Sequence, residues 1–260
     1  GLSFSFHLIS GSPVPRYGVE ISPSLVSAHQ FIHLFRGVIA MTTIADVWLS
    51  SSIDPWKRLG FSDYPIAQPD GSVVSCIPIA GLGFRFLPHI VEPSASGSCA
   101  TGWTVQSEDA TTNSVDGVAT RVIAELQPVP ELTHQLAITA IDHIVITTGS
   151  LERTCGAITE QLGLPLKRIR DAGHGVRQGF HRAGSLILEI VERPDLAPET
   201  PAEIWGVVFV VEDLDATVAW LGPDAVGATR DAVQNGRRIA SVKKEVGLGL
   251  PVALMSPHMR

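Results

Sequence analysis

Two short apolar segments, each with one side chain that can bind a metal or carry a proton, constrain this chain more than any other feature. The first runs from Ile141 to Ile146 and contains His143, and the second runs from Leu186 to Glu192 and contains Glu189. Both are rich in β-branched residues, which favour strands. A histidine or a carboxylate inside such a strand requires a polar partner, because burying it alone costs several kcal/mol.

The order of elements around these segments resembles one module of a known superfamily. A helix is predicted from Leu151 to Leu162, followed by strands at 166–170, 177–182 and 185–191. Strand–helix–strand–strand–strand, with His143 on the first strand and Glu189 on the last, resembles the vicinal oxygen chelate superfamily. Its members include glyoxalases, extradiol dioxygenases, epimerases and bleomycin-resistance proteins. The resemblance covers residues 138–257 and extends more weakly over residues 41–132.

The resemblance implies an α+β fold in which paired βαβββ modules form half-open barrels of mixed sheet. Four modules would give two domains, the first of them degenerate. We expect an irregular leader at 1–40, a degenerate domain at 41–132, a linker at 133–137 and a glyoxalase-like domain at 138–257. The leader need not be native, because the first methionine is Met41 and the composition changes there. Residues 115–126 are predicted to be helix-like, and Asn235-Gly236 a hairpin turn.

Composition restricts the partners. The chain has 260 residues, of which 45% are hydrophobic, so it can bury a sizeable core. A net charge of -7 argues against nucleic acid, which requires a basic surface. No apolar run is long enough to span a membrane, and three cysteines without disulfide or metal spacing indicate a reducing compartment. We therefore expect a cytoplasmic protein that binds a small molecule; a homodimer remains open.

The resemblance also implies a metal site. In the superfamily, ligands come from the first and last strands of each module, and His143 and Glu189 match those positions. Such a donor set suits a divalent ion: Fe, Mn, Ni or Zn. The fourth module departs from the pattern, with Gly206 at the second histidine position and Ala253 at the second acid position.

Other residues near this site, or in the early modules, bear on the same question. Three protein ligands are the usual minimum for a catalytic metal, so His174 or His181 would have to complete the set. The early modules offer Asp46 at the histidine position and Arg85 near the acid position, where its charge would repel a cation. Without a metal, His143 and Glu189 could be a hydrogen-bonded structural pair or an acid–base pair.

Four further residues are candidates for substrate binding: Arg177, His181, Trp205 and Arg237. Alternation puts Arg177 and His181 on one face of their strand and Gln178 on the other. A guanidinium on a concave sheet can clamp a carboxylate or phosphate, although a polar strand edge in water would look the same. Trp205 would form a wall beside Gly206, and either Arg237 or its neighbour would face the cavity.

Two functions are consistent with these observations. In the first, the protein is a glyoxalase-like enzyme of lyase, isomerase or dioxygenase type. His143 and Glu189 would then be the catalytic residues or the ligands of a divalent metal. In the second, it is a metal-free protein of the bleomycin-resistance type that sequesters a ligand. The intact His143 and Glu189 favour the enzyme, whereas Gly206 and Ala253 favour the binding protein.

Overall fold

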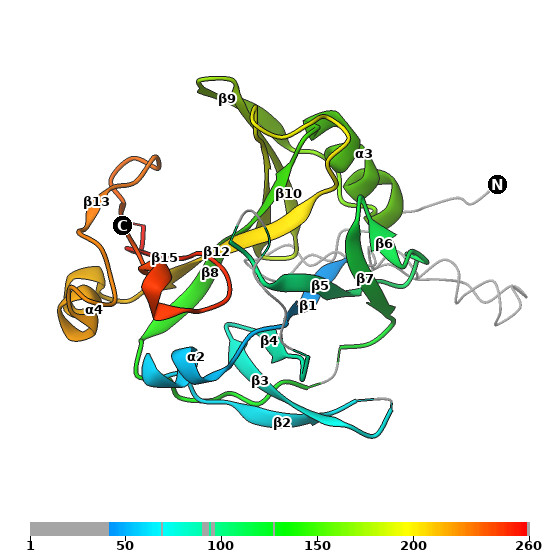
Figure 1. The fold of residues 1–260 in the computed structure, drawn as a ribbon. Helices are drawn as coiled ribbons and strands as arrows, with labels where there is room; N and C mark the ends of the chain where they lie inside the picture. The colour runs from blue at the N-terminus through cyan, green and yellow to red at the C-terminus, as the bar shows by residue number, and fades with distance from the viewer. Residues whose placement is uncertain (1–41, 69, 90–93, 95–96, 127, 259–260) are drawn as a thin grey trace, which may run out of the picture. The chain divides into compact units, whose positions relative to one another are not determined.

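The computed structural model describes residues 42–68, 70–89, 94, 97–126 and 128–258. The predicted leader lies outside the described residues. Residues Ala40–Arg260 form one compact unit, which is built on two mixed β-sheets with few helices (Figure 1). This α+β architecture of two mixed sheets confirms the fold class predicted from the sequence.

The first sheet has seven strands in the order β2-β3-β4-β1-β5-β7-β6. Its strands alternate between an apolar face that enters the core and a second, more polar face. Its elements are β1 (Thr43–Leu49), α2 (Asp54–Arg58), β2 (Tyr64–Ala67), β3 (Val73–Ile79), β4 (Leu82–Phe86), β5 (Ala100–Gln106), β6 (Ser114–Val115) and β7 (Val118–Ile123).

The second sheet has eight strands in the order β13-β14-β15-β12-β8-β11-β10-β9. Its elements are β8 (Ile138–Thr148), α3 (Leu151–Leu162), β9 (Arg168–Gly173), β10 (Val176–Ala183), β11 (Leu186–Glu192), β12 (Glu203–Val211), α4 (Leu214–Leu221), β13 (Arg230–Asp231), β14 (Arg238–Ser241), the 3-10 helix η1 (Lys244–Val246) and β15 (Val252–Met255).

The two sheets repeat one pairing scheme. In the first, β1 runs parallel to β4 and antiparallel to β5, and β5 runs parallel to β7. In the second, β8 runs parallel to β11 and antiparallel to β12, and β12 runs parallel to β15. No described helix follows β5, whereas α4 follows β12, and the first sheet has one strand fewer. The first half is therefore the reduced copy, as expected.

Helix α3 occupies the residues that the sequence predicts. Ser150 caps its first turn by accepting a hydrogen bond from the backbone N–H of Arg153, and Gly163 ends it in the left-handed conformation at φ 66°. Its buried residues recur at helical spacing and include Leu151, Ile158 and Leu162. The helix covers one face of the second sheet at β10 and β11.

A continuous apolar core joins the two sheets. Trp56 of α2 is fully buried, and its ring lies 5.4 Å from that of Phe84 on β4 and 6.4 Å from that of Phe209 on β12. The indole N–H donates to the carbonyl oxygen of Leu248 at 2.8 Å. An aromatic residue of the first half is thus anchored by the backbone of the second.

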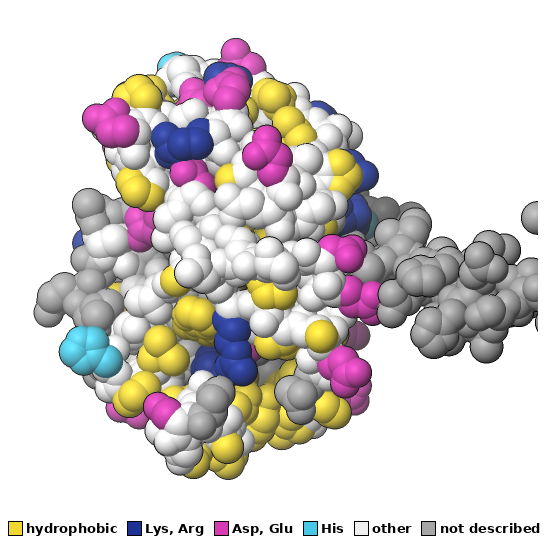
Figure 2. Space-filling view, turned by 90° about the vertical axis from the view of Figure 1, so that its right-hand side faces the viewer, with side chains coloured by type: hydrophobic (Ala, Val, Ile, Leu, Met, Phe, Trp, Pro, Cys, Tyr) yellow, Lys and Arg dark blue, Asp and Glu magenta, His cyan; other side chains and the backbone are white. Residues whose placement is uncertain are grey.

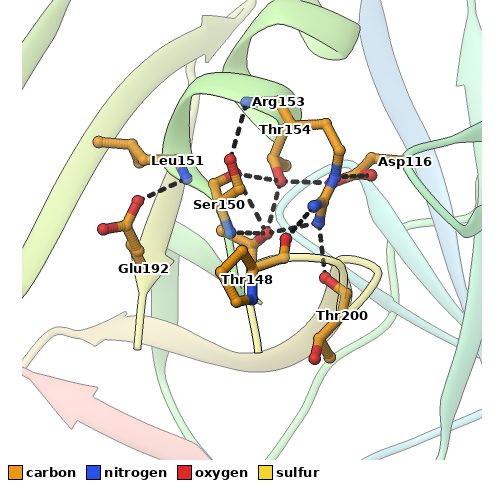
Figure 3. Close-up of polar contacts among 9 residues, drawn as sticks. Asp116, Thr148, Ser150, Leu151, Arg153, Thr154, Glu192 and Thr200 are labelled. Carbon is orange, nitrogen blue, oxygen red and sulfur yellow. Dashed lines mark hydrogen bonds and ion pairs between the residues drawn. The ribbon is translucent and has the colours of Figure 1, made fainter. Parts of the chain in front are cut away.

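A polar joint adds to this contact (Figure 3). Asp116, in the turn between β6 and β7, accepts hydrogen bonds from Arg153 Nε at 2.6 Å and from the hydroxyl of Thr154. Arg153 also donates to the carbonyl oxygen of Thr200 at 2.6 Å. One carboxylate of the first half therefore binds the first turn of α3.

The helix-like prediction for residues 115–126 is wrong. Asp116 and Gly117 both have positive φ, 47° and 95°, and form the two-residue turn between β6 and β7. An Asp-Gly pair favours this kind of hairpin turn. The turn chemistry therefore overrides the apparent helical spacing of the apolar residues around it.

No described helix is both long and apolar enough to span a membrane.

Candidate functional site

A β-bulge brings two consecutive residues of β8 onto one face of the second sheet. Val208 of β12 pairs with His143, and the next residue, Phe209, pairs with Ile141, so Asp142 is the extra residue. In a regular strand, neighbours point to opposite faces; a bulge breaks that alternation. As a result, Asp142 Oδ2 lies 2.8 Å from His143 Nδ1.

The other ring nitrogen of His143 faces Glu189. Strands β8 and β11 are parallel neighbours, with His143 in register with Ile187, two residues before Glu189. His143 Nε2 lies 3.1 Å from Glu189 Oε2, and both side chains are largely buried, at 13% and 14% exposed. The sequence-based expectation that these side chains meet on adjacent strands is confirmed.

Gln178 of β10 is the third member of the site. Its Nε2 donates to Glu189 Oε1 at 2.5 Å. The amide oxygen is buried and has no hydrogen-bond partner among the described residues. Sequence reasoning assigned Gln178 to the face opposite Arg177 but did not include it in the site; the pairing of its neighbour Phe180 with Glu189 is the feature that would have identified it.

Arg237 binds the carboxylate oxygen of Asp142 that does not face His143. Its side chain is only 1% exposed, Nη1 donates to Asp142 Oδ1, and Nε donates to the carbonyl oxygen of Ser256 at 2.8 Å. Burial raises the pKa of Asp142, but hydrogen bonds from His143 and Arg237 outweigh this and hold it well below its usual range. Arg237, a candidate for substrate binding, contacts Asp142 in this structure.

Two of the candidates, His181 and Arg177, lie on the face of the sheet opposite to Glu189. Gly179, between Gln178 and Phe180, packs against Cys155 and Leu151 of α3. His181 shares that face, is buried, and its Nδ1 lies 2.8 Å from the carbonyl oxygen of Leu164. Burial lowers the pKa of His181, opposed by its backbone hydrogen bonds.

Arg177 also points away from His143. It forms ion pairs with Glu152 of α3 and, at 3.5 Å, with Glu192. His174 occupies the exposed turn between β9 and β10 with a φ of 53°. The structure therefore does not bring Arg177, His174 or His181 to His143. Strand alternation puts Arg177 and His181 on the face opposite to Glu189, and His174 lies in the turn.

The fourth module provides a bulge at the equivalent place. Ile204 pairs with Ile146 and Gly206 with Val145, so Trp205 is the extra residue, as Asp142 is in β8. Trp205 is half-buried beside the residue that stands for the second histidine. A Cβ added at Gly206 would lie 2.8 Å from the carbonyl oxygen of Pro251, so this position has no room for a side chain as the backbone stands.

The comparisons with known proteins bear on this geometry. Residues 140–236 match the model of the Glyoxalase/Bleomycin resistance protein/Dioxygenase superfamily. The match covers this part of the chain and confirms the resemblance expected from the sequence. No curated protein matches the chain.

Two of the solved structures that match the chain share its fold at low sequence identity. A triple mutant of 4-hydroxymandelate synthase from Streptomyces coelicolor is 13% identical over 85% of this chain and 94% of its own, with a TM-score of 0.62. A xylose isomerase-like TIM barrel/4-hydroxyphenylpyruvate dioxygenase fusion protein is 10% identical over 84% and 49%, with a TM-score of 0.56. Methylmalonyl-CoA epimerase from Mycobacterium tuberculosis is 17% identical over 49% and 94%, with a TM-score of 0.41.

The superfamily implies a divalent metal, and the side chains present allow a test of fit. The described residues contain no group of three or more His, Cys, Asp or Glu side chains that could hold an ion. His143 and Glu189 are nevertheless 3.1 Å apart, and two ligands at right angles around one ion are separated by about 3 Å. The partnerless amide oxygen of Gln178 belongs to a side chain that already contacts Glu189. His143 and Glu189 therefore fit two positions around an ion, one fewer than the usual minimum for a catalytic metal.

Proposed function

We propose that the protein is a small-molecule enzyme of isomerase or lyase type, which moves a proton at a carbon next to a carbonyl group. The observation that carries this proposal is the position of His143 between two carboxylates, Asp142 at Nδ1 and Glu189 at Nε2. Asp142 Oδ2 lies within hydrogen-bonding distance of Nδ1. Nε2 lies 3.1 Å from the Glu189 carboxylate, so an imidazole and a carboxylate, two groups able to take up or release a proton, stand side by side.

A proton held by His143 Nε2 or by Glu189 is what the pair would exchange with a substrate. A group that takes a proton from carbon and returns it on the other face, or to a neighbouring atom, catalyses isomerisation. When the substrate instead carries a leaving group on the neighbouring carbon, removal of the proton expels that group, and the proton can be passed to it, which is elimination. Asp142 orients the ring and stabilises its protonated form, as a carboxylate does behind many catalytic histidines. Arg237 keeps Asp142 ionised.

If a divalent metal is bound, His143 Nε2 and Glu189 would hold it. It would supply Lewis-acid polarisation of a substrate carbonyl oxygen. Asp142 would then orient the imidazole ring of His143 by accepting a hydrogen bond from its Nδ1–H. The role of Asp142 and Arg237 is the same in either case, because both act on the ring nitrogen that faces away from the substrate.

Solvent exchange tests the proposal without a known substrate. The protein is incubated in D2O with a panel of carbon acids (2-oxo acids, 2-hydroxy ketones and CoA thioesters), with and without Zn(II), Mn(II) or Fe(II). Mass spectrometry follows deuterium incorporation. We expect incorporation into at least one member, lost in His143→Ala and Glu189→Gln and kept in His174→Asn, a matched change at an exposed histidine that preserves the left-handed turn.

Two results would count against it. Incorporation that survives both His143→Ala and Glu189→Gln would place the chemistry elsewhere. Binding of panel members without any incorporation or turnover would favour the sequestering protein, in which His143 and Glu189 are only a structural pair.

A further inference from the structure

The first sheet carries a charged pair at the positions that His143 and Glu189 occupy in the second. In β1 a bulge at Ala45 precedes Asp46, as the bulge at Asp142 precedes His143. Asp46 is in register with Gly83 of β4, two residues before Arg85, just as His143 is in register with Ile187, two residues before Glu189. Asp46 is therefore the equivalent of His143, and Arg85 the equivalent of Glu189.

In the first sheet, the guanidinium of Arg85 therefore stands where the second sheet has the carboxylate of Glu189. Arg85 Nη2 lies 2.6 Å from Asp46 Oδ2, with the two side chains only 12% and 7% exposed. Asp46 Oδ1 accepts further hydrogen bonds from Trp48 Nε1 at 2.7 Å and from the hydroxyl of Thr104 at 2.8 Å. The carboxylate is saturated with donors, which holds the guanidinium in one orientation.

Donors exceed acceptors in this cluster. Gln68 Oε1 accepts from Arg85 Nη1 at 3.2 Å, but Arg85 Nε and Gln68 Nε2 are buried without a partner among the described residues. A buried donor that lacks an acceptor is costly, more so when it is charged. The polar part of the site therefore favours a ligand that brings oxygen acceptors and negative charge.

The pair opens onto a cavity on the outer face of the first sheet. The cavity has a volume of about 780 Å³, and its lining includes Asp46, Arg85, Tyr64, Ile66, Arg121 and Ile123. An adjoining hollow of about 410 Å³ shares Arg85 and Arg121 and adds Glu125 as its one acidic residue. Figure 2 shows basic side chains bordered by hydrophobic ones on a hollowed part of the surface.

Arg121 provides a second positive charge, because Asp46 pairs with Arg85 and not with Arg121. It lies on β7, its side chain is exposed, and it forms no ion pair with any described residue. Arg85 lies across the cavity on β4. Two guanidinium groups beside apolar walls are suited to a carboxylate that carries a hydrophobic body, since one end of such a ligand pairs with arginine and the other leaves water.

We propose that the first sheet binds an organic carboxylate with an apolar body, with Arg121 and Arg85 as the residues that recognise its carboxylate. This site is separate from the His143 site: it lies on the other sheet and offers two arginines, whereas the His143 site offers two acidic side chains. Binding there requires neither a metal nor His143, so it stands or falls independently of the proposed enzyme.

Calorimetric titration with a matched pair of probes tests this inference. The probes are 4-phenylbutyrate and 4-phenylbutan-1-ol, which differ in the charged group. We expect the carboxylate to bind more tightly than the alcohol, and Arg121→Gln to weaken the carboxylate about tenfold, the loss of one partly solvated charge contact. The alcohol should be unaffected. Arg182→Gln, on β10 of the other sheet, serves as the matched control, and His143→Ala should bind the carboxylate as the native protein does.

Several results would overturn it. These are equal binding of acid and alcohol, no binding of the acid at millimolar concentration, or equal weakening by Arg121→Gln and Arg182→Gln. Loss of binding in His143→Ala would assign the carboxylate to the second sheet instead. Arg85→Lys retains a charge beside Asp46 and removes the planar fork, so it should fold and still weaken the acid.

Discussion

Asp142 and His143 are consecutive residues of one strand, yet their side chains meet at 2.8 Å, Oδ2 to Nδ1. Only the bulge in β8 allows this, because it puts both side chains opposite Val208. The contact fixes which ring nitrogen faces Glu189. The local distortion of the backbone therefore orients the candidate catalytic histidine together with Glu189 on the neighbouring strand.

The first prediction concerns acid stability. The pKa of Asp142 is lowered in the folded state, so this carboxylate stabilises the fold above about pH 4, the ordinary value, and the contribution is lost as the pH falls through the lowered pKa. Asp142→Asn should cost about 3 kcal/mol at pH 7, since Arg237 keeps its buried charge. The gap between the two proteins should narrow towards pH 3. Urea unfolding at pH 7, 5 and 3 measures it.

The control is Asp215→Asn, which removes the carboxylate of an exposed pair with Arg238. Its stability should stay close to that of the native protein at each pH. An Asp142→Asn variant whose deficit is unchanged between pH 7 and pH 3 would show that the carboxylate is not held ionised by its partners.

A second prediction compares two glycines around α3. A Cβ at Gly149 would lie 1.9 Å from the carbonyl oxygen of Ala197, a backbone atom that cannot move alone. At Gly156, in the middle of α3, a Cβ meets nothing within 4 Å. Gly149→Ala should destabilise the protein severely, whereas Gly156→Ala should stabilise it by about 0.5–1 kcal/mol through helix propensity. Melting temperatures of both variants provide the check; shifts of the same sign would contradict it.

The third prediction concerns the joint between Asp116 and Arg153. Arg153 is 35% exposed, so solvent screening reduces the strength of the pair, and a double-mutant cycle with Asp116→Asn and Arg153→Met should give a coupling of about 1 kcal/mol. Asparagine tolerates the left-handed conformation of residue 116, which keeps the turn intact. Asp116→Val should cost more than Asp116→Asn, because a β-branched residue is strained there. Additive single effects would show that the two halves are not coupled through this pair.

How far the sequence predicts this structure depends on whether a signal is local. The bounds of α3 were predictable because Ser150, the apolar spacing and Gly163 all agree. The role of Gln178 was not, since alternation divides a strand into two faces without saying which one holds the site. The contact of Asp142 with His143 also escaped prediction, because no residue type marks a bulge in an apolar strand.

The fourth prediction concerns a second imidazole. The sequence pattern suggests that Gly206→His would restore a ligand, but the carbonyl oxygen of Pro251 occupies the space for its Cβ. Val208 pairs directly with His143, and therefore lies on the same face. Val208→His should raise affinity for Zn(II) or Ni(II), and Gly206→His should not and should lower stability. Competition with a chromogenic chelator measures both; a larger gain from Gly206→His would mean that β15 moves to admit the side chain.

The aromatic contact of Trp56 with Phe84 and Phe209 determines how the two sheets unfold. A boundary near residue 137 separates the two sheets in sequence, yet it cuts through one shared core. Expressed alone, residues 138–258 would leave Phe209 facing water and the carbonyl of Leu248 without its indole donor. Heating should therefore melt both sheets in a single cooperative transition, so that gene segments resembling independent modules act as one thermodynamic unit.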